Sequence, residues 1–166
     1  MYDNNEQSWS KQARYFFLYD YGGTGKTFIW RALAIALRSK GEIVLIVASS
    51  EIVALLIPGE RTAHSRFGIP ITIDEASTCG IDHDTPLALL VIKAKLIIWE
   101  EAPMMHIHCF KALDRTFRDV MKEVDKKNNY ISFGSKVVVF DGDFRKILPV
   151  IAKGTRPEIV NATINS

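Results

Sequence analysis

The stretch DYGGTGKT, residues 20–27, decides the predicted fold of this chain. It follows a short aromatic-rich run at 15–19 and opens a segment with helical periodicity at 27–39. A glycine-rich loop between a strand and a helix is typical of a phosphate-binding loop, whose pattern is G-x-x-x-x-G-K-[ST]. Asp20 stands where this pattern has its first glycine. The stretch therefore predicts a nucleotide site that departs from the pattern at one residue.

The residues of this loop suit a polyphosphate. Glycines let consecutive backbone N–H groups point at phosphate oxygens, and the helix N-terminus adds partial positive charge. We expect Lys26 to reach the β- and γ-phosphates and the Thr27 hydroxyl to ligate Mg²⁺. A plain glycine-rich turn is the alternative. The predicted nucleotide-binding residues of the loop are Gly22, Gly23, Thr24, Gly25, Lys26 and Thr27.

Apolar runs alternate with helical patterns along the chain, which predicts an α/β fold with a mostly parallel sheet and helices on both faces. Continuous apolar runs are typical of parallel strands that are buried on both faces. We predict strands at 15–19, 43–48, 95–99 and 136–140. We predict helices at 27–39, 50–56, 87–94 and 106–124, with a helical turn at 64–67.

Helical periodicity also predicts which side chains face the core. Gly41 is expected to close the first long helix, and the tail from residue 152 has no strong pattern. In the first long helix the expected inward residues are Ile29, Leu33 and Leu37. In the last one they are Ile107, Phe110, Leu113, Phe117, Val120 and Val124.

The composition predicts one ordinary globular domain covering residues 1–166. Hydrophobic residues make up 48% of the chain, and the net charge of +2 is too small to indicate a nucleic-acid partner by itself. Cys79 and Cys109 are too few for a disulfide framework, so we expect buried thiols and a reducing compartment. We see no targeting segment and no apolar run long enough for a membrane span, and expect a cytosolic or nuclear protein.

Acidic and basic residues follow two of the predicted strands. Glu100 and Glu101 end the third strand, where an acid that holds Mg²⁺ and an acid that activates water are needed for nucleotide hydrolysis. Asp143, Arg145 and Lys146 follow the fourth strand and could sense the γ-phosphate. Solvated polar turns are the alternative at both places.

Two further clusters have weaker signals. TAHSRF, residues 62–67, places a cation, hydroxyls and a ring together, which suits single-stranded nucleic acid; a surface turn with Phe67 in the core is the alternative. His106, His108 and Cys109 could suggest a metal, but residues two apart on a helix do not share a face, so we expect a plain helix start.

Taken together, these segments resemble the Pif (petite integration frequency) family of ATP-dependent DNA helicases, especially its plant and Helitron-transposon branch. Several long motifs occur in the family's order over nearly the whole chain. The segments are YGGTGKT at 21–27, VASSEIVALLIPGERTAHSRFGIP at 47–70, LIIWEEAPM at 96–104 and FGSKVVVFDGDFRKILPVI at 133–151.

The resemblance implies the first RecA-like, P-loop NTPase domain of a motor that moves 5′ to 3′ on single-stranded DNA. It implies ATP and Mg²⁺ as cofactors, a second RecA-like domain in the intact protein, a nuclear or mitochondrial location, and roles in DNA repair, recombination and telomere maintenance. Carried over by motif, Glu100 holds Mg²⁺ with Thr27, Glu101 is the catalytic base, Arg145 and Lys146 form the sensor, and Gln7 reads adenine. The DNA-contacting positions are Ser49, Ser50, Thr62, His64, Ser65 and Phe67.

Departures from the family pattern gather around the nucleotide. Asp20 and Asp141 replace glycines, Glu100 replaces aspartate and Lys146 replaces glutamine, so we expect weaker nucleotide binding and more strongly impaired hydrolysis. Without a second motor domain we expect a half-motor that does not unwind DNA. The alternative is a non-catalytic nucleotide- or DNA-binding remnant. Single G-to-A transitions explain the five glycine replacements, which suggests a decaying gene copy; these are Asp20, Glu51, Glu60, Ser135 and Asp141.

Overall fold

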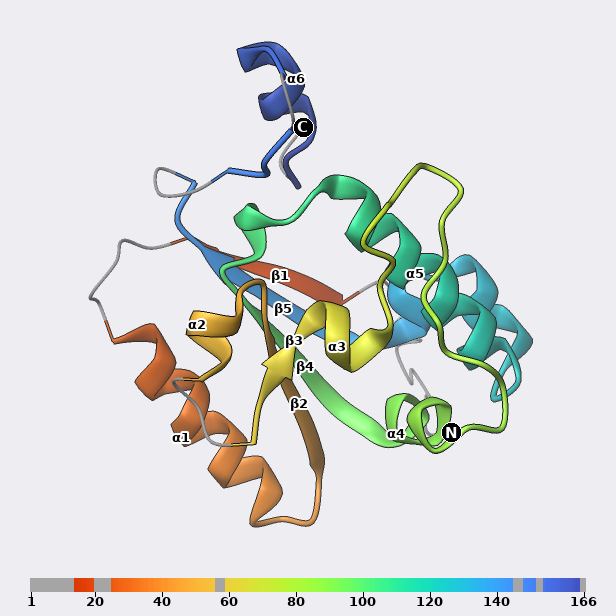
Figure 1. The fold of residues 1–166 in the computed structure, drawn as a ribbon. Helices are drawn as coiled ribbons and strands as arrows, with labels where there is room; N and C mark the ends of the chain where they lie inside the picture. The colour runs from red at the N-terminus through yellow and green to blue at the C-terminus, as the bar shows by residue number, and fades with distance from the viewer. Residues whose placement is uncertain (1–13, 20–24, 56–58, 145–147, 152–153, 165–166) are drawn as a thin grey trace, which may run out of the picture.

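The chain folds around one five-stranded parallel sheet with the strand order β1-β5-β4-β2-β3 (Figure 1). The computed structural model describes residues 14–19, 25–55, 59–144, 148–151 and 154–164. The strands are β1 (Arg14–Tyr19), β2 (Ile43–Ala48), β3 (Arg61–Thr62), β4 (Ala94–Glu100) and β5 (Val137–Gly142). The predicted parallel α/β fold is confirmed.

The helices connect these strands and extend beyond them. The α-helices are α1 (Lys26–Arg38), α2 (Glu51–Ala54), α3 (Ala63–Phe67), α4 (Pro86–Lys93), α5 (Ile107–Lys122) and α6 (Arg156–Asn161). The 3₁₀ helices of the described residues are η1 (Ala102–Met104), η2 (Lys126–Tyr130) and η3 (Ser132–Ser135). Gly41, with a φ of 78°, follows α1 in the left-handed conformation that a helix end favours, so its predicted role is confirmed. Among the described residues, no helix is long and apolar enough to span a bilayer.

Helices cover both faces of the sheet (Figure 1). α1 packs on one face, where its buried residues meet Val44, Ile46 and Ile98. α3, α4 and α5 pack on the other face against the intervening residues of the same strands, among them Val47 and Trp99. Successive side chains of a strand point to opposite faces, so the apolar runs at 43–48 and 94–99 serve both layers.

The inward face of α1 differs from the sequence-based prediction. Trp30 and Ala34 are buried, with Leu37 packed partly against them, whereas Ile29 is 52% exposed and Leu33 is also exposed. Both stripes have helical spacing, so periodicity does not choose between them. The direction in which α1 leaves the preceding loop decides which stripe faces the sheet.

The last predicted helix is largely confirmed as α5, which buries Phe110, Leu113, Phe117 and Val120. The prediction for Val124 was wrong, because α5 ends at Lys122 and Val124 is 56% exposed. α6 was not predicted. Its local signal is a capping box, in which the Glu158 carboxylate accepts hydrogen bonds from the backbone N–H and the hydroxyl of Thr155.

The two cysteines and His106 have structural roles. Cys79 and Cys109 are buried free thiols, as predicted, and burial raises the pKa of each thiol to about 11. His106 caps α5, because its Nδ1 atom accepts a hydrogen bond from the His108 backbone N–H at 3.1 Å. This contact confirms the plain helix start.

Candidate active site

Three strand ends converge at one edge of the sheet. β1 lies beside β5, with Leu18 opposite Asp141, and β5 lies beside β4, with Phe140 opposite Trp99. Because all three strands run parallel, the end of β1 at Tyr19, the acidic pair Glu100–Glu101 at the end of β4 and the end of β5 lie at the same edge. A ligand crevice forms at this edge in open α/β sheets.

α1 begins at Lys26, and Gly25 precedes it in a left-handed conformation with a φ of 85°. Glycine suits this position because it has no β-carbon to strain the backbone. The first N–H groups of a helix have no carbonyl partner within it, so this end can bind an anion. Lys26 and Thr27 therefore lie where a phosphate would need them. Gly22, Gly23, Thr24 and Asp20 lie outside the described residues.

Glu100 is the last residue of β4 and is only 3% exposed. Burial, together with the neighbouring carboxyl groups of Asp141, Glu60 and Glu101, raises the pKa of this carboxyl to about 7. Its Oε1 atom is buried and has no hydrogen-bond partner among the described residues. A buried carboxylate oxygen without a partner is stabilised by a cation, so this residue fits a Mg²⁺ ligand.

Glu101 occupies the turn that follows β4, with a left-handed φ of 54°. Its carbonyl accepts a hydrogen bond from the Met104 N–H, and its own N–H donates to Asp141 Oδ1 at 3.1 Å. This turn also packs on the end of β5, where Gly142 lies against Pro103. The predicted catalytic base thus stands on a backbone that is held from both sides.

Asp141, which the sequence marked only as a departure from the family pattern, lies inside the candidate site. It is 2% exposed and accepts hydrogen bonds from the Trp30 indole and the Glu101 N–H. Burial raises the pKa of Asp141, while these hydrogen bonds and nearby Lys26 oppose that rise. The only signal in the sequence is an acidic residue at the end of an apolar strand.

The predicted γ-phosphate sensor is described only in part. Asp143 is buried directly after β5, at the same edge of the sheet as Glu100. Arg145 and Lys146 lie outside the described residues, as does Gln7, the predicted adenine contact. The roles of these three residues stay predictions.

The predicted DNA-contacting residues gather where β2 and β3 end. Ser49 Oγ accepts a hydrogen bond from the Trp99 indole at 2.9 Å. Ser50 caps α2, and Thr62 caps α3 by accepting the Ser65 N–H at 3.2 Å. The hydroxyls of Ser49, Ser50 and Thr62 therefore already form hydrogen bonds within the protein.

Two of the remaining predicted contacts reach the surface to different degrees. Ser65 is exposed, and His64 is half-buried, which lowers the pKa of its imidazole. Both lie on α3, directly after the cap at Thr62. A solvent-facing hydroxyl is thus available beside the short strand β3.

Phe67 was predicted as a DNA contact, and the structure contradicts this. Its side chain has 0% exposure and meets Phe117 edge-to-face, with the ring centres 5.5 Å apart. A ring without exposed surface cannot stack on a base. The alternative that the sequence left open, a core role, is the correct one.

A family model described as PIF1-like helicase matches residues 1–166. The chain belongs to the PIF1-like helicase family. ATP-dependent DNA helicase PIF4 of Trypanosoma brucei brucei is 28% identical to it over 130 residues, which is 76% of this chain and 15% of that protein. The present chain therefore spans less than a sixth of that relative.

Solved structures of this family share the fold. Bacteroides Pif1 bound to single-stranded DNA is 28% identical, with a TM-score of 0.69 over 84% of this chain and 31% of that one. Bacteroides Pif1 in complex with ADP-AlF3 and single-stranded DNA is 27% identical, with a TM-score of 0.69 over 90% of this chain and 32% of that one. This PIF1-like chain thus matches about a third of each, and the P-loop NTPase assignment is confirmed.

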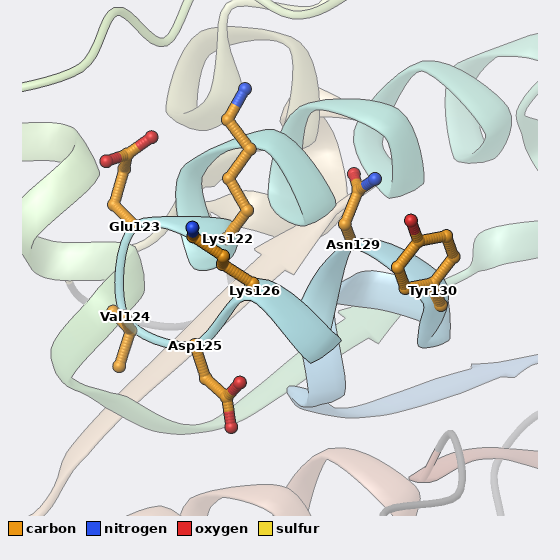
Figure 2. Close-up of a pocket in the computed structure, with 7 residues that line it drawn as sticks. All are labelled: Lys122, Glu123, Val124, Asp125, Lys126, Asn129 and Tyr130. Carbon is orange, nitrogen blue, oxygen red and sulfur yellow. The ribbon is translucent and has the colours of Figure 1, made fainter.

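A hollow of about 610 Å³ lies far from these strand ends in the PIF1-like fold, at the C-terminal end of α5 (Figure 2). Figure 2 shows lysine and carboxylate side chains around it in mixed order. None of its lining residues belongs to the candidate active site. They are Lys122, Glu123, Val124, Asp125, Lys126, Asn129 and Tyr130.

Proposed function

We propose that this chain forms the ATP-binding part of a DNA helicase motor that couples ATP hydrolysis to 5′-to-3′ movement on single-stranded DNA. The observation that carries the proposal is that the start of α1 and the turn after β4 meet at Asp141: Trp30 and the Glu101 N–H both donate to its carboxylate, and Lys26 lies near it. These groups are among the parts that phosphoryl transfer requires. Membership of the PIF1-like helicase family supports the same function.

Each described side chain has a role in this proposal. Lys26 binds phosphate oxygens as a cation, and Thr27 with Glu100 would hold Mg²⁺. Mg²⁺, when bound, supplies positive charge against the β- and γ-phosphates. Glu101 orients the attacking water and accepts its proton. The buried Glu100 oxygen that has no hydrogen-bond partner among the described residues supports the Mg²⁺ assignment.

Single-stranded DNA is the proposed partner. Bacteroides Pif1, which shares this fold, is solved in complex with single-stranded DNA. In the present chain, Ser49 and Ser50 lie beside the nucleotide edge of the sheet, because β2 pairs with β4 as far as Ala48 and Glu100 and the Ser49 N–H donates to the Glu100 carbonyl. We assign the chain to the plant or Helitron-transposon branch on its motifs. We place it in the nucleus or mitochondrion, with roles in repair, recombination or telomere maintenance.

The alternative is a non-catalytic nucleotide- or DNA-binding remnant. The observation that favours it is the buried Asp141 carboxyl, whose negative charge near Lys26 competes with a bound phosphate. Glu100 in place of the family's aspartate also lengthens a ligand of a cation that needs near-ideal geometry. Both changes reduce hydrolysis more than they change the fold.

Titration of the 166-residue polypeptide with a fluorescent ATP analogue and Mg²⁺ tests the proposal. Lys26→Ala should weaken binding by about ten- to a hundredfold, as expected for a charge-assisted hydrogen bond. Lys40→Ala, at an exposed lysine after α1, is the matched control and should bind as wild type does. No binding by wild type, or equal binding by Lys26→Ala, would overturn the proposal.

Phosphate release with single-stranded DNA present separates the two candidates. If the chain is catalytic, ATP turnover should be measurable and Glu101→Gln should abolish it while leaving nucleotide binding intact. Binding without turnover in wild type selects the non-catalytic remnant. We expect no strand separation by these 166 residues alone, since the solved relatives are about three times as long as the part they share with this chain.

A further inference from the structure

We propose that Asp141 is a positioning residue for Glu101, and that Trp30 completes the arrangement by tying Asp141 to α1. The inference rests on the proposed function, in which Glu101 is the catalytic base. It assigns Asp141 a task in the site, beyond its being a replaced glycine.

The two oxygens of the Asp141 carboxylate have different donors. Oδ1 accepts the Glu101 backbone N–H at 3.1 Å, and Oδ2 accepts the indole N–H of Trp30. The Trp30 contact is buried, since Asp141 is 2% and Trp30 is 6% exposed, and the Glu101 contact is part-buried. Buried hydrogen bonds to a carboxylate are stronger than exposed ones, and a buried donor that loses its acceptor is costly. The three residues thus form one unit.

The Glu101 turn depends on this carboxylate. The sheet pairing of β4 ends at Glu100 on the β2 side and at Trp99 on the β5 side, and the next N–H group, that of Glu101, donates to the Asp141 carboxylate. Glu101 moreover adopts a left-handed φ of 54°, a conformation that non-glycine residues rarely adopt. The Asp141 acceptor stabilises the residue in that conformation. The direction in which the Glu101 side chain leaves the backbone is set by the same φ and ψ.

Trp30 connects this turn to the phosphate-binding element. It lies four residues after Lys26, about one turn further along α1. Through Asp141, α1 and the turn at Glu101 therefore share one carboxylate. The geometry links the element that would hold the phosphates to the residue that would orient the attacking water.

A purely electrostatic role of Asp141 and a positioning role predict different changes in nucleotide affinity for Asp141→Gly, so an experiment can separate them. If Asp141 acts only by repelling phosphate, Asp141→Gly should strengthen binding of ADP and of ADP with aluminium fluoride equally. If Asp141 positions Glu101, the same variant should weaken the transition-state analogue relative to ADP, because only the analogue mimics the transferring phosphoryl group and its nucleophile. The ratio of the two affinities is the diagnostic quantity.

The test uses the 166-residue chain with Asp141→Gly, Asp141→Asn and Trp30→Phe. In nucleotide-free protein, NMR should show the Trp30 indole signal displaced and the Glu101 amide exchanging about tenfold faster in Asp141→Gly, as expected for one lost hydrogen bond. With Mg²⁺, the affinity ratio of the analogue to ADP should fall by about tenfold in Asp141→Gly. It should fall less in Trp30→Phe, which removes the indole donor but keeps the Asp141 carboxylate and its hydrogen bond to Glu101.

Asp141→Asn keeps the shape and a single acceptor oxygen, so it should lie between wild type and Asp141→Gly; it serves as the main variant if Asp141→Gly does not fold. Unchanged amide exchange or an unchanged affinity ratio in the folded variants would overturn the positioning role. Wild type that binds neither ADP nor the analogue would overturn the proposed function itself, and with it the purpose of the arrangement. The two failures are thus distinguishable.

Discussion

Gly142 and Pro103 approach so closely that a β-carbon built on Gly142 would lie 2.3 Å from Pro103 Cδ. The φ of Gly142 is 154°, a conformation that also disfavours other residues. The end of β5 therefore fits beneath the turn that carries Glu101 only because residue 142 has no side chain. This contact joins the end of β5 to η1, the 3₁₀ helix that follows β4, within the candidate site.

Gly142→Ala should lower the free energy of unfolding by about 1–3 kcal/mol, because the added methyl overpacks a buried contact. Urea unfolding followed by circular dichroism measures the change. Gly41→Ala is the matched control: its φ of 78° is also unfavourable for alanine, but no atom lies within 4 Å of the added carbon. A Gly142→Ala variant no less stable than Gly41→Ala would contradict the close contact.

Phe67→Ala should lower the free energy of unfolding by about 3–5 kcal/mol, as expected for truncating a buried aromatic ring. Ile71→Ala, at a side chain that is 94% exposed, should change it by less than about 0.5 kcal/mol. Thermal or urea unfolding of both variants decides the matter. Phe67→Leu, which retains apolar volume, should bind single-stranded DNA as wild type does; weaker binding by the folded protein would revive the stacking role.

Glu60 should make stability depend on pH. Both its carboxylate oxygens are buried without a hydrogen-bond partner among the described residues, and burial raises the pKa of this group from 4.5 to about 7. Between these values the unfolded chain releases the proton while the folded chain keeps it. Stability should therefore fall as pH rises from about 4.5 to 7, and remain lower above that range.

Glu60→Gln removes this titrating group, so comparison with wild type gives the contribution of Glu60 to the pH dependence of stability. Above pH 7 the variant should be more stable than wild type by about 1–2 kcal/mol, a figure discounted for partial solvent screening. Near pH 4.5 the two proteins should be about equally stable. Chemical unfolding at a series of pH values gives the difference; a difference that does not vary with pH would contradict the raised pKa.

Glu100 should make Mg²⁺ binding depend on both charge and pH. Glu100→Gln should reduce the gain in ATP affinity that Mg²⁺ provides, whereas Glu51→Gln, at an exposed glutamate, should leave it unchanged. Because the pKa of Glu100 is raised to about 7, protons compete with Mg²⁺ below that pH. The Mg²⁺ affinity of wild type should fall by at most about tenfold per pH unit there. Calorimetric titrations at pH 6 and 8 measure it.

The strands were largely predictable because each is an apolar run between polar or glycine-rich segments. The predicted strand at 43–48 matches β2 at both ends, and the acidic pair at Glu100 falls at the end of β4 as expected. The two-residue strand β3 and the helix α6 were not predicted. Both are too short for periodicity to distinguish them from loops.

Within the site, the local motif at 20–27 and the pair Glu100–Glu101 were evident from residue types and spacing. The proposed roles of Trp30 and Asp141 could not be predicted from the sequence, because they depend on a contact between residues 111 positions apart. Burial of Phe67 was likewise left open, since a five-residue helix has too few turns to show which side faces the core.

The sequence by itself determined the layered parallel fold, the family and the edge of the sheet at which phosphate chemistry is expected. Strand hydrophobicity and the glycine-rich loop are local properties, and parallel strands bring their carboxyl ends together whatever the details of packing. Tertiary structure alone decided which stripe of α1 is buried, that Phe67 is a core residue, and that Asp141 joins Trp30 to Glu101. These depend on how the helices are placed on the sheet, which brings distant side chains within hydrogen-bond distance and excludes water from them.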